Sequence, residues 1–317
     1  MKAAVSVCNE TTAPLARPPF AYFTAAARPR LADFVHLTKP RVAVLVLFTV
    51  AVGALLAGGL HVNGFVLFNV LLGTALVAAG ASTLNQLIER RSDAHMRRTE
   101  NRPLPAGRLQ PLEVLVFGVL LGVGGVTYLA LTLNHWAAAA TAAATFFLYV
   151  GVYTPLKSRT TLNTLIGAVP GALPPLIGWA AVRGGLTWEA APLFLIVFLW
   201  QVPHFLAIAW IYRDQYARAG LRMQPCYDPS GRGTGWRMVG YCLVLLPASL
   251  APLLLGAGGV MYGVGAGLLG AGFLASAVGF LRTPSTPRAW RVLRASLLYL
   301  PGVFALLLLD AAMKIIF

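Results

Sequence analysis

Apolar residues dominate this chain in long unbroken runs, unlike the half-apolar patterns of soluble domains. About nine such runs can be read, and each is about 20 residues long, which is enough to cross a ~30 Å hydrocarbon core as a helix. They lie at roughly 42–60, 65–88, 112–132, 136–153, 162–182, 189–211, 237–256, 259–281 and 290–312. The pattern predicts an all-α integral membrane protein with about nine transmembrane helices, because a membrane β-barrel would show short alternating segments instead.

Composition and charge narrow the class of protein further. The 317 residues are 58% hydrophobic and only 11% charged, and the mean hydropathy is +0.72, which no ordinary soluble domain reaches. The net charge of +15 forms no basic stripe on a soluble domain, so membrane lipid is the expected partner and nucleic acid is not. The three cysteines form no CxxC pair and predict neither a disulfide nor a zinc site.

Arginine and lysine gather in alternate loops, and this predicts the orientation in the membrane. The loops after the second, fourth, sixth and eighth runs hold nearly all loop cations, whereas opposite loops such as "HVNG" and "GAGG" are uncharged. The positive-inside rule then places the N-terminus and the charged loops in the cytoplasm. Because the N-terminal residues resemble a transit peptide only weakly, the expected location is a bacterial inner membrane. Residues 1–34 lack an apolar core of signal-peptide length, so we expect a disordered cytosolic tail before a polytopic domain at 35–317.

The stretch "NQLIERRSDAHMRRTENRPLP", Asn85–Pro105, concentrates charge in this otherwise apolar chain. Asn85, Glu89 and Asp93 follow one another in steps of four, so they lie along one helix face that ends at the cytosolic edge of the second run. Ionisable groups at such depth are candidates for function. Carboxylate and amide oxygens are also the hard ligands that Mg²⁺ takes, alongside water and substrate phosphate.

Three arginines follow the acids directly: Arg97, Arg98 and Arg102. Guanidinium groups suit phosphate oxygens. Carboxylates beside arginines at a membrane edge therefore predict a metal–diphosphate site that faces a lipid-soluble substrate. The alternative is an ordinary solvated loop, in which the arginines set topology and the acids neutralise them.

Extended to "NQLIERRSDAHMRRTENRPLPAG", the same stretch resembles the first acidic motif of the UbiA superfamily of intramembrane prenyltransferases. More narrowly, it is similar to the branch that makes haem O. Further similar stretches are "LTKPRV" (Leu37–Val42), "YTPLKSRTTLNTLIGAVPGALPPLIGW" (Tyr153–Trp179) and "WQVPHFLAIAWIYRDQYARAGLRMQP" (Trp200–Pro225). The resemblance runs from about residue 35 to the end of the chain.

This resemblance implies a UbiA-type fold, with nine transmembrane helices around a central cavity. It implies transfer of the farnesyl group of farnesyl diphosphate to a vinyl group of haem b, with addition of a hydroxyl, to make haem O. Mg²⁺ would assist ionisation of the diphosphate. Farnesyl diphosphate and haem b would then be the substrates, and a downstream haem A synthase is a candidate partner.

The resemblance also implies roles for single residues. Asn85, Glu89 and Asp93 match the metal–diphosphate motif, and Lys157 would hold diphosphate oxygens. Asp214 would complete the metal and catalytic set from a second, thinner motif, "IYRDQY", where many relatives carry two or three aspartates. The implied diphosphate-binding residues are Arg97, Arg98, Arg102, Tyr153 and Tyr212. The sequence departs from many relatives at Glu89, where they carry aspartate, and it leaves the number of Mg²⁺ ions open.

Aromatic and histidine side chains supply the remaining candidates. An allylic cation could be stabilised by the aromatic ring faces of Tyr149, Tyr153, Trp200 and Tyr212. His204 lies inside the sixth run, directly after Pro203. It is either a haem-binding residue, as axial ligand or polar contact to the porphyrin, or a histidine hydrogen-bonded to a neighbouring helix.

The fifth run is interrupted by prolines, Pro170, Pro174 and Pro175. Proline removes a backbone donor and bends or breaks a helix. Such a break either widens a cavity for a flat macrocycle or is a packing kink.

Two rival functions stay open. The first is a UbiA-type prenyltransferase that acts on another aromatic or tetrapyrrole acceptor. The second is a membrane transporter, which would place charges along a pore in mid-membrane. The acids of this chain instead cluster at the cytosolic edge of a predicted helix, beside cations that suit phosphate.

Overall fold

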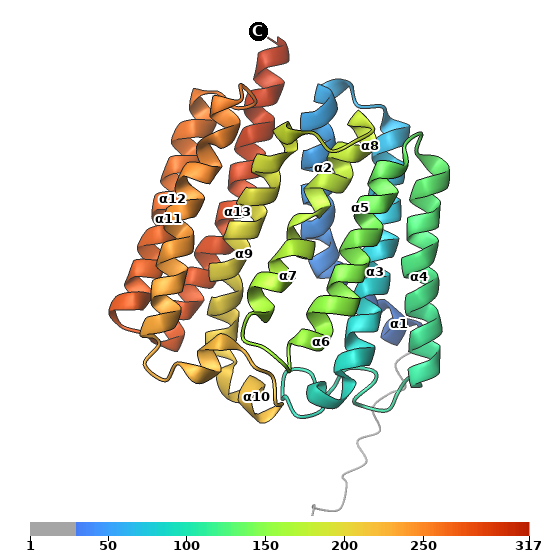
Figure 1. Ribbon diagram of the computed structural model, residues 1–317, viewed down its shortest axis with the longest axis vertical. Coiled ribbons are helices and arrows are strands. Elements are labelled where there is room, and N and C mark those ends of the chain that lie inside the picture. The colour runs from blue at the N-terminus through green and yellow to red at the C-terminus, as the bar shows by residue number, and fades with distance from the viewer. Residues whose placement is uncertain (1–29, 317) are drawn as a thin grey trace, which may run out of the picture.

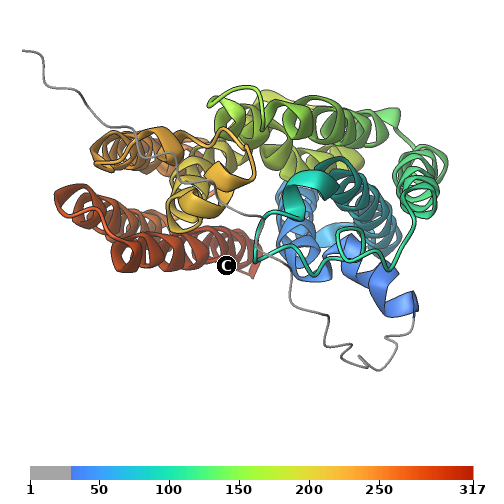
Figure 2. The ribbon, with the colours of Figure 1, turned by 90° about the horizontal axis from the view of Figure 1, so that it is seen from below.

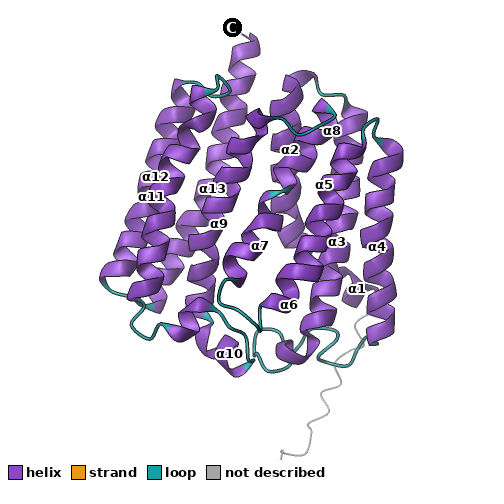
Figure 3. Cartoon of the chain, in the orientation of Figure 1, coloured by secondary structure: helices purple, strands orange, loops and turns teal. Residues whose placement is uncertain are grey.

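The computed structural model describes residues 30–316, and every regular element in that range is helical (Figures 1 and 3). Nine helical segments among these residues are long and apolar enough to cross a membrane. This confirms the predicted all-α membrane protein with about nine spans. Residues 1–29 of the predicted tail lie outside the described residues, so the tail stays a prediction, and the described helical structure begins at Arg30.

Several spans consist of more than one helix. The first three spans are α1 (Arg30–Thr38) with α2 (Pro40–Gly58), α3 (Gly64–Asp93) and α4 (Pro111–Thr132). The next three are α5 (Trp136–Phe147) with η2 (Leu148–Tyr153) and α6 (Thr154–Leu156), α7 (Asn163–Ala172) with α8 (Pro174–Arg183), and η3 (Trp188–Ala190) with α9 (Ala191–Ile211). The last three are α11 (Arg232–Leu254), α12 (Val260–Arg282) and α13 (Thr286–Ile316). Short helices between spans are η1 (Gly59–His61), α10 (Arg213–Arg218) and η4 (Gln224–Tyr227).

The spans form two groups that meet at α7, α8 and α9. Helix α9 packs against α7, α11 and α13, whereas α2 packs against α8 and α3, and α3 against α4. Seen from the end that carries the long loops, α11–α13 lie at one side and α2–α5 at the other (Figure 2). The long loops, residues 94–110 and 212–231, lie at this same end (Figure 1). The segments richest in charge therefore face the same side of the helices.

The break between α7 and α8 allows α8 to pack closely against α2. It falls at Leu173, immediately before Pro174, as the prolines of this span predict. Beyond it, α8 lies so close to α2 that a methyl group on Gly178 would overlap the carbonyl oxygen of Val50. A methyl group on Gly53 would likewise overlap the carbonyl oxygen of Pro175. Backbone-to-backbone contact favours the packing-kink interpretation over a widened cavity.

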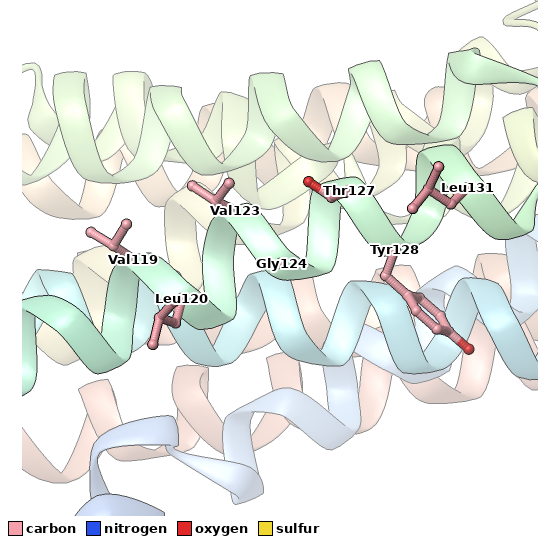
Figure 4. Close-up of a pocket in the computed structure, with 7 residues that line it drawn as sticks. All are labelled: Val119, Leu120, Val123, Gly124, Thr127, Tyr128 and Leu131. Atoms are coloured by element: carbon pink, nitrogen blue, oxygen red, sulfur yellow. The ribbon is translucent and has the colours of Figure 1, made fainter.

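An apolar groove lies along α4, and within residues 30–316 its lining comes from that helix alone (Figure 4). Val119, Leu120 and Val123 belong to it, and each is exposed. Exposed apolar side chains on a membrane span suit contact with lipid tails. This groove is separate from the charged end of the helices, and the predicted central cavity stays a prediction.

Candidate active site

The last turns of α3 carry the predicted acidic motif into the protein interior. Asn85 and Asp93 are each 1% exposed, and the side chain of Glu89 is 11% exposed. The helix continues without a break to Asp93, so the four-residue spacing keeps all three side chains on one face. Buried carboxylates need partners, and the neighbouring segments supply them.

Lys157 pairs with Glu89 from the end of the fourth span. Its Nζ lies 2.6 Å from Glu89 Oε1 and 4.6 Å from the centre of the Tyr153 ring. The ammonium of Lys157 thus lies over the ring of Tyr153. Although burial strongly disfavours the ammonium, Glu89, Tyr153 and Tyr149 together outweigh it and hold the pKa of Lys157 well above its usual range. Lys157 therefore stays charged.

A π-helical turn, η2, places these aromatic residues. Pro155 has no backbone N–H, and the helix before it widens so that Thr154 N–H donates to the carbonyl of Tyr149, five residues back. The Thr154 hydroxyl donates to the same carbonyl at 2.8 Å. The rings of Tyr149 and Tyr153 then lie with centres 5.4 Å apart. Turns of this kind are frequent at functional sites.

The loop after α3 folds back onto the acidic motif. Arg102 Nη1 donates to Asp93 Oδ2 at 2.7 Å, and the Thr99 hydroxyl donates to the Asp93 carbonyl at 2.9 Å. The Arg102 side chain is only 19% exposed. A charge-assisted contact of this kind is stronger than a neutral hydrogen bond, so it fixes the direction in which Arg102 points.

A third cation, Lys39, reaches the motif from the junction of α1 and α2. Its Nζ donates to Asn85 Oδ1 at 3.3 Å, and Asn85 Nδ2 in turn donates to Thr154 Oγ1 at 3.2 Å. Electrostatic interactions also link Lys39 with the acids and cations around it. We name this group of five the charged cluster: Lys39, Glu89, Asp93, Arg102 and Lys157. Three basic and two acidic side chains meet here, and their formal net charge of +1 suits an anionic ligand.

The surroundings of Asp93 Oδ1 indicate whether the site suits a metal ion. This oxygen is buried and has no hydrogen-bond partner among the described residues. A buried carboxylate oxygen without a partner is costly, and a divalent cation would satisfy it. Residues 30–316 contain no group of three or more histidine, cysteine, aspartate or glutamate side chains placed to hold a metal. Mg²⁺, which needs only one or two protein carboxylates, nevertheless fits.

Other predicted site residues lie apart from the charged cluster. Arg97 is exposed. Arg98 lies over the Tyr212 ring at 4.7 Å and donates to the Tyr216 hydroxyl at 3.1 Å, so it joins the two long loops. The Asp214 side chain is 85% exposed and lies 3.7 Å from its neighbour Arg213. The structure therefore brings Arg98 and Tyr212 together, but joins neither them nor Asp214 to Glu89 and Asp93.

Sequence reasoning missed Lys39 and Thr154 as members of this site. Lys39 belongs to the quoted "LTKPRV", and a lysine followed by proline at the start of an apolar run was the available signal. Thr154 carries no such signal, because its role depends on the π-helical turn. Both became visible only through their contacts with Asn85.

His204 lies on α9 and contacts α13. Its Nδ1 is 2.8 Å from the Ser296 hydroxyl, and its ring stacks on Trp200 with centres 4.9 Å apart. Phe205 meets the same ring edge-on at 5.2 Å. An intramembrane histidine held in one orientation fits both interpretations that the sequence left open.

Comparison with known proteins agrees with this geometry. The protoheme IX farnesyltransferase of Solibacter usitatus is 48% identical over 77% of this chain and 83% of its own length. The protein of the same name from Salinibacter ruber is 44% identical over 81% of this chain and 91% of its own length. High identity over most of both chains shows common descent and a common fold.

Solved structures show the same architecture at lower identity. A digeranylgeranylglyceryl phosphate synthase superposes with a TM-score of 0.75 at 16% identity, over 90% of this chain and 99% of the other. A UbiA homologue from Archaeoglobus fulgidus, bound to GPP and Mg²⁺, gives 0.60 at 14% identity, over 87% and 99%. The sequence profile described as the UbiA prenyltransferase family matches residues 46–300. With its helical architecture and its close relatives, this chain belongs to the UbiA prenyltransferase family.

Proposed function

We propose that this protein transfers the farnesyl group of farnesyl diphosphate to a vinyl group of haem b and so makes haem O. The observation that carries the proposal is the charged cluster at the end of α3, in which Arg102 and Lys157 pair with the two carboxylates and Lys39 contacts Asn85. Relatives at 44% to 48% identity bear the name protoheme IX farnesyltransferase, which supports haem as the acceptor. As a multi-pass membrane enzyme, the protein can hold the apolar farnesyl chain and the porphyrin of these substrates within the bilayer.

The cations of the cluster act on the leaving group. When the bond between the farnesyl carbon and the diphosphate oxygen breaks, both electrons stay with the diphosphate. Lys39, Arg102 and Lys157 would bind the oxygens on which this charge grows. They are already held in place by Asn85, Asp93 and Glu89, and such preorganised charges in a dry site strongly stabilise a transition state.

Mg²⁺ is the proposed cofactor. Asn85, Glu89 and Asp93 would hold it, with the unpartnered Asp93 Oδ1 as one ligand. When bound, the ion supplies further positive charge to the diphosphate. We propose Asp214 as an additional ligand and Tyr212, Arg97 and Arg98 as further diphosphate contacts from the two long loops.

Aromatic side chains and His204 would act on the other reactant. The rings of Tyr149 and Tyr153 can face the allylic cation left on the farnesyl group. The π electrons of the haem vinyl group then form the new carbon–carbon bond, and water adds to the neighbouring carbon and loses a proton. His204 is proposed to bind the haem, as axial ligand of the iron.

The test is product analysis with the full chain in lipid nanodiscs. Incubation with haem b, farnesyl diphosphate and Mg²⁺ should yield a haem whose mass has grown by a farnesyl and a hydroxyl group, and a chelator should stop the reaction. Parallel incubation with 4-hydroxybenzoate tests the rival acceptor. Farnesylated 4-hydroxybenzoate without any haem product would replace this proposal by the rival one.

Location and partners follow from the same proposal. The end that carries the charged cluster is expected to face the cytoplasm at the inner membrane, because loop cations gather there. A contact with a downstream haem A synthase stays a prediction, and its basis is only that such an enzyme would consume haem O.

A further inference from the structure

We propose that Ser296 is a positioning residue for His204, which fixes the imidazole with its proton on Nδ1 and leaves Nε2 to bind haem iron. Ser296 lies on α13 and is fully buried, whereas His204 lies on α9. The inference rests on the haem-binding role proposed for His204 and adds the residue that prepares it.

The argument starts from the single proton of the serine hydroxyl. Ser296 Oγ lies 2.6 Å from the carbonyl oxygen of Leu293, in the same helix, and 2.8 Å from His204 Nδ1. A carbonyl oxygen only accepts, so the hydroxyl proton is directed to Leu293. The remaining contact is then a hydrogen bond that His204 Nδ1–H donates to Ser296 Oγ. One side chain therefore sets the tautomer of the histidine.

A second residue holds both partners of this bond. Trp200 Nε1 donates to the backbone carbonyl of Ser296 at 2.7 Å, and the Trp200 ring stacks on His204 at an angle of 26°. Trp200 is only 4% exposed. The indole thus ties α9 to α13 at the serine and limits rotation of the imidazole.

The other ring nitrogen is not used by the fold. Among residues 30–316, His204 is hydrogen-bonded through Nδ1 alone. A neutral imidazole that donates from Nδ1 carries its lone pair on Nε2, and histidines that bind metals almost always donate their second nitrogen in this manner. Ser296 therefore gives His204 the form that an iron ligand requires.

Binding of ferric haem b to the full chain in nanodiscs, without farnesyl diphosphate, tests this inference. The readouts are the dissociation constant and the Soret and electron paramagnetic resonance spectra. The variants are Ser296→Ala, Ser296→Thr, His204→Ala and the matched control Ser276→Ala. Ser276, on α12, donates to the Phe273 carbonyl at 2.6 Å in the same way, but it has no histidine partner in the part of the chain that the structure describes.

Ser296→Ala should weaken haem binding about tenfold and shift its spectra toward those of His204→Ala. Ser296→Thr, which keeps the hydroxyl, should retain the wild-type spectra, as should Ser276→Ala. Each variant should still bind farnesyl diphosphate, which shows that it is folded. If Ser296→Ala keeps the wild-type spectra and affinity while His204→Ala changes both, the proposed role of Ser296 is wrong and that of His204 stands. If His204→Ala also leaves the haem affinity and spectra unchanged, His204 is no iron ligand and the inference is wrong. The mass of the reaction product still tests the transfer reaction separately.

Discussion

Lys39 holds a backbone conformation that lysine seldom adopts. Its φ of +48° is the only positive value of a non-glycine residue in the described part of the chain. Pro40 disfavours helical geometry in the residue before it, so α1 ends and α2 begins around this point. A left-handed conformation costs a non-glycine residue about 1–2 kcal/mol. Such strain is typical of functional positions, and here it directs the ammonium toward Asn85.

Replacing Lys39 by glycine removes both the backbone strain and the ammonium charge, and two measurements separate these effects. Glycine adopts positive φ freely, so Lys39→Gly should leave the melting temperature unchanged or raise it slightly. Loss of the ammonium should lower the affinity for farnesyl diphosphate at least tenfold, because hydrogen bonds to charged groups contribute about 1.5–3 kcal/mol. Thermal unfolding and ligand titration measure the two effects. Arg41→Ala, at an exposed neighbour, is the control, and normal affinity in Lys39→Gly would contradict the proposed role.

The carboxylates should matter for turnover more than for haem binding. Glu89→Gln and Asp93→Asn keep the size of each side chain but remove the charge that would hold Mg²⁺. We expect the rate of farnesyl transfer to fall by about 10²–10³, the usual effect of losing one preorganised electrostatic group. Initial rates at saturating substrate measure this, with haem absorption as the check on folding. Near-normal turnover in either variant would remove the metal proposal.

Residue spacing predicts contacts within one helix and fails between distant segments. The four-residue steps from Asn85 to Asp93 placed these side chains correctly on one helix face. Lys39 lies 46 residues before its partner Asn85, and no local period reports that distance. Asp214 and Arg98 show the same limit, because the path of a loop decides where its side chains point.

At the scale of elements, proline predicted where a helix breaks but not which local structure or packing the break produces. Pro174 marks the start of α8, as its lack of an N–H donor predicts. The π-helical turn before Pro155 could not be predicted, because proline allows several ways to end a helix. Nor could the contact of α8 with α2 be foreseen, since the glycines that permit it look like any others in a chain with 32 glycines.

Gly178 tests the packing of α8 on α2. In Gly178→Ala the new methyl group would overlap the Val50 carbonyl, and overpacking of this kind costs about 1–3 kcal/mol or more. We therefore expect a clear loss of thermal stability in nanodiscs. The control is Gly267→Ala on α12, where an added Cβ meets open space and should be neutral or slightly stabilising. Equal stability of the two variants would mean that α2 and α8 are not in such close contact.

Asp228 controls the start of α11 and should make its stability depend on pH. It accepts hydrogen bonds from Thr234 N at 2.6 Å and the Thr234 hydroxyl at 2.8 Å. Although burial works against ionisation, these bonds hold the pKa of Asp228 below its usual value. The stabilisation is thus complete above about pH 4, the usual aspartate pKa, and is lost as pH falls through the lower folded value.

The corresponding variant is Asp228→Asn, which keeps the shape and loses the charge. At pH 7 it should be less stable by about 1 kcal/mol, the usual worth of a helix cap. The difference from the wild type should shrink at pH 3, where the wild-type carboxyl is becoming protonated. Unfolding curves at the two pH values measure this, and Glu100→Gln, an exposed loop substitution, is the control. A difference that does not vary with pH would show that charge is unimportant at this cap.

For the whole molecule, hydropathy predicted the spans well because the bilayer sets their length. Nearly every observed span overlaps its predicted run within a few residues, and the largest difference is at the start, where α1 extends the first span back to Arg30. Hydrophobic periodicity could not predict that α1 contacts the loop after α3, where Arg108 Nε lies 3.0 Å from Asp33 Oδ1. Such docking depends on partners 75 residues apart.

Orientation in the membrane is the remaining property of the whole molecule that an experiment can decide. Loop cations gather at the end that carries residues 94–110 and 212–231, so this end should face the cytoplasm. In a chain whose native cysteines are replaced by alanine, Glu100→Cys should react with a membrane-impermeant maleimide only in inverted vesicles. Leu186→Cys, 53% exposed at the opposite end, should react in intact spheroplasts. The reverse pattern would place the charged cluster outside the cytoplasm, where a cytosolic supply of farnesyl diphosphate could not reach it, and the proposed reaction would need another source of substrate.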